Sequence, residues 1–134
     1  MDRTRAAVKE VIPCDANAEE ILFDPSKGPF DFILITFCLE SACADLKSYN
    51  ESFCKLSNLL NPGGKFFFVG NLMETIYKVK DKIFDHLAVT KDNVTNAIES
   101  SGMVIESYEW ANTTEVEQFT GDGEGTFCIV AVKK

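Results

Sequence analysis

Two apolar runs stand out in the pattern of hydrophobic and polar positions along the chain. Residues 32–37 and 65–69 are almost continuously apolar, so an extended strand there would present apolar side chains on both faces. This pattern is typical of strands in the middle of a sheet that helices cover. A third buried strand is predicted at 126–132, and shorter strands are predicted at 8–12 and 103–110.

Apolar residues with helical spacing lie between these strands. Across residues 45–60 they recur at steps of three and four, with Asp45 as the expected N-cap and residues 61–64 (Asn-Pro-Gly-Gly) as the stop. A second helix is predicted to begin after the cap Thr90. Residues 71–89 are ambiguous, because their apolar positions fit a helix but also fit a long excursion that contains only a short helix.

Strands that alternate with helices in this way indicate an α/β fold with a mostly parallel sheet. The last two predicted strands, 103–110 and 126–132, have no helix between them, so we expect them to form an antiparallel hairpin. The length of 134 residues, with 46% hydrophobic and 25% charged residues, is that of one ordinary globular domain. We therefore expect residues 1–134 to form a single domain.

Charge and cysteine content narrow the classes of function. The chain has 21 acidic and 13 basic residues, a net charge of −8 and no basic stripe, which argues against nucleic-acid binding. Its apolar runs are too short to cross a bilayer, its N-terminus does not resemble a secretory signal, and its 5 cysteines form no Cys-x-x-Cys pair. We therefore expect a cytoplasmic protein with reduced thiols and with neither a nucleic-acid nor a membrane partner.

Residues with candidate chemistry follow the carboxyl ends of the predicted strands, which is where open parallel sheets bind ligands. They are Cys14, Asp15 and Ala16 after the first strand, Thr36 to Glu40 after the second, and Gly70, Asn71 and Glu74 after the third. Carboxylates gathered at one edge can bind a cationic amine or accept hydrogen bonds from ribose and adenine. Taken alone, Asp15 could equally cap a turn, and Glu40 and Glu74 could be solvated charges.

The remaining candidate groups carry a weaker signal. His86 is the single histidine, and its charged amphipathic surroundings favour a surface or packing position over a role as catalytic base. No set of histidines and cysteines in the sequence has the spacing of a metal site. Residues 121–125 (Gly-Asp-Gly-Glu-Gly) precede a strand and do not link a strand to a helix, so they favour a flexible hairpin connection over a phosphate loop. Asp122 could still face the ligand edge of the sheet.

Several short motifs occur together in a fixed order. They are residues 12–15 (Ile-Pro-Cys-Asp), 37–46 (Phe-Cys-Leu-Glu-Ser-Ala-Cys-Ala-Asp-Leu), 59–64 (Leu-Leu-Asn-Pro-Gly-Gly) and 124–127 (Glu-Gly-Thr-Phe). In this order, from about Val8 to the C-terminus, the chain resembles the family of nicotinamide, phenylethanolamine and indolethylamine (thioether) methyltransferases, which are class I S-adenosylmethionine-dependent enzymes. The Pro-Gly-Gly turn is common to many class I methyltransferases, whereas the Cys-Leu-Glu-x-Ala-Cys-x-Asp-Leu string is specific.

The resemblance implies a role for each matched position. Cys14, Asp15 and Ala16 match the segment whose aspartate accepts a hydrogen bond from the adenine amino group of S-adenosylmethionine, and Thr36 matches a further residue of the cofactor pocket. The matched positions of the substrate pocket are Glu40, Gly70, Glu74, Tyr77 and, one position from the family's acid, Asp122.

The branches of the family differ at two of these positions. The nicotinamide branch has Asp at the position of Gly70 and Ser at that of Glu74, whereas Glu74 and Tyr77 match the phenylethanolamine branch. The resemblance therefore implies a small-molecule amine as substrate and argues against nicotinamide, without identifying the amine. The implied reaction is an in-line displacement in which a neutral amine nitrogen attacks the methyl group, with Glu40 and Glu74 as catalytic residues that orient the amine and accept its proton.

The chain also differs from the family pattern. It has no glycine before Gly28, whereas a class I methyltransferase has a glycine-rich turn at its first helix. We therefore expect a partial Rossmann-like methyltransferase sheet that corresponds to the C-terminal part of the domain and lacks the N-terminal glycine-rich cofactor motif. Two interpretations stay open: an enzyme whose N-terminal half is missing from the sequence or supplied by another chain, and an inactive remnant or interaction partner that pairs with a full-length relative through a free sheet edge.

Overall fold

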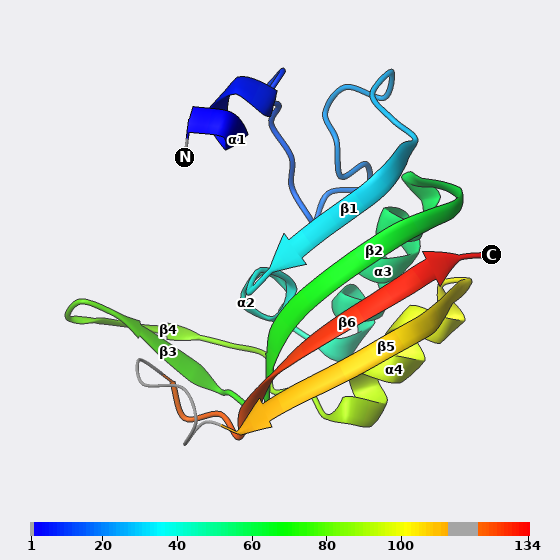
Figure 1. The fold of residues 1–134 in the computed structure, drawn as a ribbon. Coiled ribbons are helices and arrows are strands. Elements are labelled where there is room, and N and C mark those ends of the chain that lie inside the picture. Colours follow the sequence, from blue (N-terminus) through cyan, green and yellow to red (C-terminus); the bar gives the residue numbers. More distant parts are fainter. Residues whose placement is uncertain (1, 113–120) are drawn as a thin grey trace.

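A mixed four-stranded sheet forms the centre of the structure, and helices lie on one of its faces (Figure 1). The computed structural model describes residues 2–112 and 121–134. In chain order the elements are α1 (Asp2–Ala7), β1 (Phe30–Thr36), α2 (Leu39–Ala42), α3 (Leu46–Asn58), β2 (Leu60–Leu72), β3 (Ile76–Val79), β4 (Lys82–Asp85), α4 (Lys91–Ser100), β5 (Met103–Asn112) and β6 (Gly125–Lys133).

The strand order of the main sheet is β1-β2-β6-β5. β1 and β2 pair in parallel, and β6 is antiparallel to both β2 and β5. β1, β2 and β5 therefore run in one direction, and β6 returns between β2 and β5. This confirms the predicted α/β sheet with a C-terminal antiparallel hairpin. β3 and β4 form a separate two-stranded antiparallel sheet.

The two long helices begin at the caps that the sequence predicts. Asp45 accepts a hydrogen bond from the Ser48 backbone N–H at 2.8 Å, and the Thr90 hydroxyl accepts one from the Asn93 backbone N–H at 3.1 Å. Each contact belongs to a capping box, so the first orphan donors of both helices are satisfied. The short helix α2, which the apolar pattern does not predict, carries Glu40. Among the described residues, no helix is long and apolar enough to cross a membrane.

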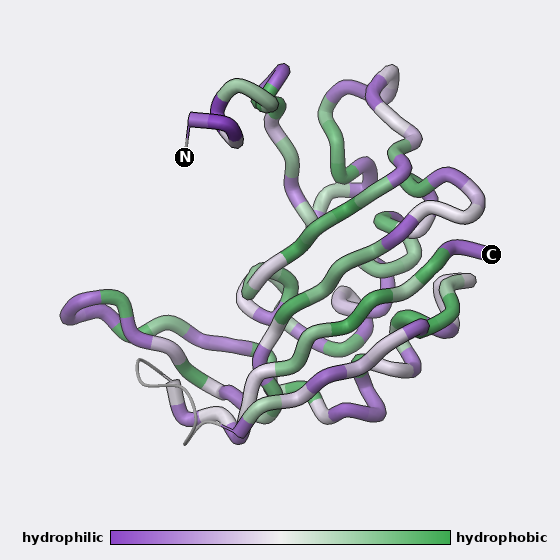
Figure 2. The backbone as a smooth tube through the Cα atoms, in the orientation of Figure 1, coloured by the Kyte–Doolittle hydropathy of each residue, from purple (hydrophilic) through white to green (hydrophobic). Residues whose placement is uncertain are grey.

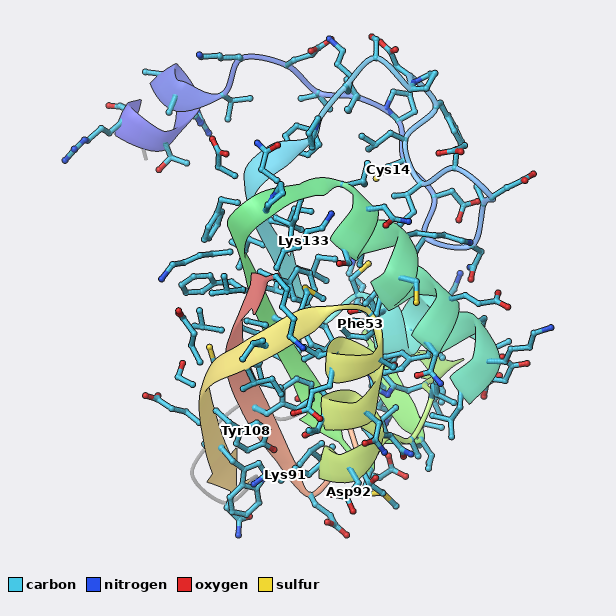
Figure 3. The ribbon with its side chains drawn as sticks, turned by 90° about the vertical axis from the view of Figure 1, so that its right-hand side faces the viewer. Cys14, Phe53, Lys91, Asp92, Tyr108 and Lys133 are labelled. Atoms are coloured by element: carbon cyan, nitrogen blue, oxygen red, sulfur yellow. The ribbon has the colours of Figure 1, made fainter. Side chains whose placement is uncertain are left out.

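The core lies between the main sheet and helices α3 and α4. Phe53 of α3 packs edge-on against Phe66 and Phe68 of β2, with ring centroids 5.7 and 5.1 Å apart (Figure 3). Phe127 of β6 and Tyr49 of α3 are also fully buried. Aromatic side chains bury more apolar area than any others, so this cluster accounts for much of the stability of the sheet–helix interface.

The opposite face of the sheet is also apolar, but no helix in the described part of the chain covers it. We call this the open face and define it by the residues that point away from the helices: Phe32, Leu34, Phe67, Val130 and Val132. Their strand neighbours point into the core, because side chains alternate along a strand. Figure 2 shows β1, β2 and β6 as hydrophobic along most of their length. Phe32 and Leu34 are 51% and 59% exposed.

The predicted strand at 8–12 is wrong. Residues Asp2–Ala7, just before this segment, form α1, and residues 8–12 belong to no helix or strand. Val11 is 90% exposed. A strand needs a neighbour to satisfy its backbone N–H and C=O groups, and the described residues place none beside this segment. Only Cys14, just beyond it, forms an isolated antiparallel bridge, with Leu22.

The ambiguous segment 71–89 forms a β-hairpin and no helix. β3 and β4 pair in register, and Lys80 occupies the turn with a φ of +54°. The rings of Tyr77 and Phe84 stack across the two strands with centroids 5.2 Å apart. Aromatic and β-branched residues pair favourably across strands, so the spacing that fits a helix serves a hairpin here.

Candidate functional site

The four residues predicted to bind the cofactor line one cavity beside β1. The cavity has a volume of about 530 Å³. Cys14, Asp15 and Ala16 line the cavity together with Thr36 at the end of β1. Apolar residues of β1, α2 and α3 and of the loop before β1 form the rest of the wall. The fold therefore brings together residues that are far apart in the sequence, as the prediction requires.

Hydrogen bonds attach the segment around Asp15 to the helices. The Asn17 amide donates to the Ala42 carbonyl at 2.7 Å, and the Ser52 hydroxyl donates to the Ala16 carbonyl at 3.1 Å. Asp15 accepts a hydrogen bond from the Asn17 backbone N–H at 2.9 Å through one carboxylate oxygen. That contact is the turn cap that its sequence position also allows. Its second oxygen has no hydrogen bond to the described residues, which leaves it available to a ligand.

Glu40 is the most unusual group in the structure. It lies on α2 directly after Leu39, which lines the cavity, and its side chain is fully buried. Neither carboxylate oxygen has a hydrogen-bond partner among the described residues, and the same holds for the nearby Tyr49 hydroxyl. Burial, reinforced by the charge of Glu74, raises the pKa of Glu40 to about 7. Burial and the charge of Glu40 raise the pKa of Tyr49 well above its ordinary value.

Gly70 makes room for Glu40. A Cβ atom at this position would collide with the Glu40 carboxylate and with the Phe127 ring. The absence of a side chain at Gly70 is therefore what allows the carboxylate to lie against the end of β2. This gives a physical reason for glycine at a position that the resemblance assigns to the substrate pocket.

Glu74 lies in the connection between β2 and β3 and is buried. Its Oε2 accepts a hydrogen bond from the Asn71 side-chain amide at 2.7 Å and lies 3.2 Å from His86 Nε2. Of the two positions expected for His86, the structure supports packing and contradicts the surface, because the ring is buried against an acid of the predicted site. The contact depends on the β3–β4 hairpin, in which the His86 backbone N–H donates to the Thr75 carbonyl. A helix over residues 71–89, which the apolar spacing also allows, would therefore not predict the contact between His86 and Glu74.

Tyr77 and Asp122 lie beside Glu74 and His86. The Tyr77 ring meets the His86 ring edge-on, with centroids 6.1 Å apart. Asp122 is exposed and accepts hydrogen bonds from the backbone N–H groups of Thr75 and Ile76 and from the Thr75 hydroxyl. These bonds, the Thr75 hydroxyl first, lower the pKa of Asp122 to about 2. Asp122 thus stabilises the backbone of residues 75–76, directly after Glu74.

The fold of the chain is that of S-adenosylmethionine-dependent methyltransferases of known structure. One from Clostridium acetobutylicum aligns over 98% of this chain and 67% of its own, with a TM-score of 0.68 and 13% sequence identity. Another from Mesorhizobium loti aligns over 98% and 74%, with a TM-score of 0.64 and 16% identity. At these identities the likeness concerns the fold alone, and it confirms the Rossmann-like α/β class.

The family follows from the sequence comparison. The model of the NNMT/PNMT/TEMT family matches residues 1–134, and the chain belongs to that family. It is 31% identical to human nicotinamide N-methyltransferase over 132 residues and 31% identical to rabbit indolethylamine N-methyltransferase over 133 residues. These matches cover 98% and 99% of this chain and 50% of each relative. The chain therefore spans about half the length of the curated relatives it matches, and the family resemblance of its motifs is confirmed.

Proposed function

We propose that the chain takes part in S-adenosylmethionine-dependent methyl transfer to the nitrogen of a small-molecule amine. Glu40 is the observation that carries this proposal. A fully buried carboxylate with no partner among the described residues is costly to a fold, so a ligand is the natural partner for it. Its position directly after the cavity wall and the family membership of the chain support the same reaction.

We propose the cavity beside β1 as the site for the adenine end of the cofactor. Its mostly apolar wall suits a flat heteroaromatic ring, and the free oxygen of Asp15 can accept a hydrogen bond from an amino group. Cys14 and Ala16 flank Asp15, and Thr36 adds a hydroxyl group at the end of β1. S-adenosylmethionine supplies an electrophilic methyl group when bound.

Glu40 is proposed to accept a proton from the substrate. An aliphatic amine is largely an ammonium ion at neutral pH, and its nitrogen must lose a proton before it can form a bond to carbon. Because the pKa of Glu40 is about 7, its carboxylate form can take up that proton near the operating pH of a cell. The buried position strengthens the attraction between the carboxylate and a cation, since water does not screen it.

The other predicted residues are proposed to shape the amine site. Glu74 and Tyr77 would form its wall on the hairpin side, and Asp122 would hold the connecting loop beside Glu74. The space at Gly70 is filled by the Glu40 carboxylate, which leaves no room for the aspartate of the nicotinamide branch. We therefore propose an amine other than nicotinamide as the substrate.

Calorimetric titration of the purified chain with S-adenosylmethionine tests the cofactor site. We expect binding, and we expect Asp15→Asn to weaken it because the amide replaces an acceptor oxygen with a donor. Asp81→Asn, in the turn of the exposed hairpin, is the matched control and should bind like the unsubstituted chain. No heat at millimolar cofactor would contradict the proposal.

Methylation of a panel of amines tests Glu40. Glu40→Gln should lower the methylation rate about 10²–10⁴-fold, because the amide cannot accept a proton. Glu99→Gln, an exposed change on α4, should leave the rate unchanged. Equal rates for both variants would remove Glu40 from the site.

A second candidate function is pairing with a full-length relative through β1. This strand forms one edge of the main sheet, and its Phe32 and Leu34 side chains are exposed. A free apolar edge is a template for pairing with another chain. Phe32→Lys should abolish co-elution with such a relative, whereas Val11→Lys, also exposed but outside the sheet, should not. Equal co-elution of both variants would refute this pairing.

We also propose a cytoplasmic location. The 5 cysteines of the chain are free thiols in the structure, which suits a reducing compartment. Fractionation of expressing cells checks this location.

A further inference from the structure

Both ring nitrogens of His86 face oxygen atoms of Glu74. Nδ1 lies 3.0 Å from the Glu74 backbone carbonyl, and Nε2 lies 3.2 Å from Glu74 Oε2. Both side chains are about 3% exposed, so water does not separate the two groups. A carbonyl oxygen can only accept a hydrogen bond, which places a proton on Nδ1.

The second contact then requires another proton. A neutral imidazole with its proton on Nδ1 would present a bare Nε2 to a carboxylate oxygen, and two buried acceptors at this distance repel each other. One additional proton between Nε2 and Oε2 removes the repulsion. It can reside on the ring, which gives an imidazolium–carboxylate pair, or on the acid.

Two further residues decide where that proton resides. Asn71 donates a hydrogen bond to the same Oε2 at 2.7 Å, and Thr126 donates to the other end of the Asn71 amide at 2.9 Å. The amide thus has its NH₂ group towards Glu74 and its oxygen towards the Thr126 hydroxyl. A donated hydrogen bond favours the ionised form of a carboxylate, so the additional proton belongs to His86.

We propose that His86 is a positioning residue, held as an imidazolium by Glu74, and that it offsets part of the charge of Glu74, so that Glu40 is the acid that takes the proton of the amine. The last step rests on the proposed function. The Leu87 backbone N–H, next to His86, donates to the Glu40 carbonyl at 2.7 Å, so the end of β4 is joined directly to the helix that carries Glu40.

The positive charge of His86 matters because the other titratable groups near Glu40 are acids or neutral groups. The titratable groups that interact electrostatically with Glu40 are Glu74 of the β2–β3 connection, Tyr49 of α3, and Cys38 and Cys43 at the ends of α2. None of these groups is a cation. Around the His86 ring, the structure places Glu74 and the edge of Tyr77. Within the described residues, His86 is therefore the one group of this cluster that can carry a positive charge.

Nitrogen NMR of the imidazole tests the proposal, because His86 is the single histidine and gives one set of ring signals. At about pH 7.5, where a free imidazole is largely neutral, both ring nitrogens should carry protons. The matched Glu74→Gln variant lacks the carboxylate charge that holds the additional proton, so its ring should be neutral at this pH. An unprotonated ring nitrogen in the unsubstituted chain, or identical ring signals in both proteins, would overturn the proposal.

A titration of the Glu40 carboxyl carbon supplies a second measurement, with Glu40→Gln used to assign the signal. His86→Gln leaves the charge of Glu74 uncompensated, so the pKa of Glu40 should rise by roughly 1 unit. An unchanged or lower pKa would overturn the assigned role. Neither measurement needs turnover. Failure to methylate any amine would therefore refute the proposed function but would leave the proposed His86–Glu74 ion pair to be decided by these two measurements. If His86→Gln does not fold, the ring signals of the unsubstituted chain and of Glu74→Gln still test whether His86 is an imidazolium.

Discussion

The site depends on how closely two chemically different residues approach. Glu40 places its carboxylate where a side chain at Gly70 would stand, and the ring of Phe127 closes the space from β6. An acid of this kind is stable in the fold only because glycine occupies the facing position. The Tyr49 hydroxyl of α3, which also has no hydrogen-bond partner among the described residues, interacts electrostatically with Glu40 of α2, so these two buried polar groups come from two different elements.

Gly70→Ala should therefore lower the free energy of unfolding by about 1–3 kcal/mol, as expected for overpacking of a filled site. Urea denaturation measures this loss. In a double-mutant cycle, Glu40→Ala should recover part of it, because the substitution removes the carboxylate that the new methyl group meets. Strictly additive losses would show that the two positions do not compete for the same space.

At the scale of elements, the ends of helices and strands carry the functional groups. α2 is a single turn between β1 and α3. Its Leu39 lines the cavity, and the next residue, Glu40, is fully buried. The β3–β4 hairpin leans away from the main sheet (Figure 1), and its base brings His86 against Glu74. α4 packs against β5, where the Lys91 ammonium lies 4.4 Å from the centroid of the Tyr108 ring (Figure 3).

The Thr90 cap predicts a stability effect at this scale. Thr90→Ala removes the acceptor for the Asn93 backbone N–H and should destabilise the fold by about 1 kcal/mol. Thr4→Ala, on the exposed helix α1 that buries no side chain, is the matched control and should change the midpoint very little. Thermal melting of both variants compares the two positions, and equal shifts would contradict the assigned role of the cap.

At the scale of the whole molecule, the sheet has helices on one face and the open face on the other. β1 and β2 are apolar on both faces, a pattern typical of strands that are covered on both sides, but the helices of the described residues cover only one face. A buried acid and a net charge of −8 also make the stability of the fold depend on pH.

The sign of that dependence follows from the folded-state pKa of Glu40, which is about 7 against an ordinary value of 4.5. The folded state holds this proton more tightly than the unfolded chain, so the stabilisation is complete below about pH 4.5 and is lost as the pH rises through about 7. The total is about 3 kcal/mol. Asp122 acts in the opposite direction, because its lowered pKa adds stability that disappears as the pH falls from 3.8 towards 2.

Urea denaturation across this pH range should therefore show stability that falls between about pH 5 and 7. The Glu40→Gln variant should lose most of that slope, since its amide does not titrate. Glu99→Gln should keep it. A slope that survives in Glu40→Gln would assign the titration to another group.

Local patterns in the sequence determined much of this molecule. The caps at Asp45 and Thr90 and the continuous apolar strands are encoded within a few residues of each other, so periodicity and capping chemistry predict them. The family motifs place Cys14 and Thr36 at one pocket, and the structure brings them together.

Tertiary structure alone decided the rest, because pairing and burial depend on residues distant in the sequence. The segment 8–12 has the composition of a strand but no neighbour to pair with among the described residues. Residues 71–89 have helical spacing, yet cross-strand pairing makes them a hairpin. That hairpin sets His86 against Glu74, and the empty space at Gly70 admits the carboxylate of Glu40. Local patterns indicate which residues can do chemistry, whereas only packing fixes which of them meet and which keep their charge.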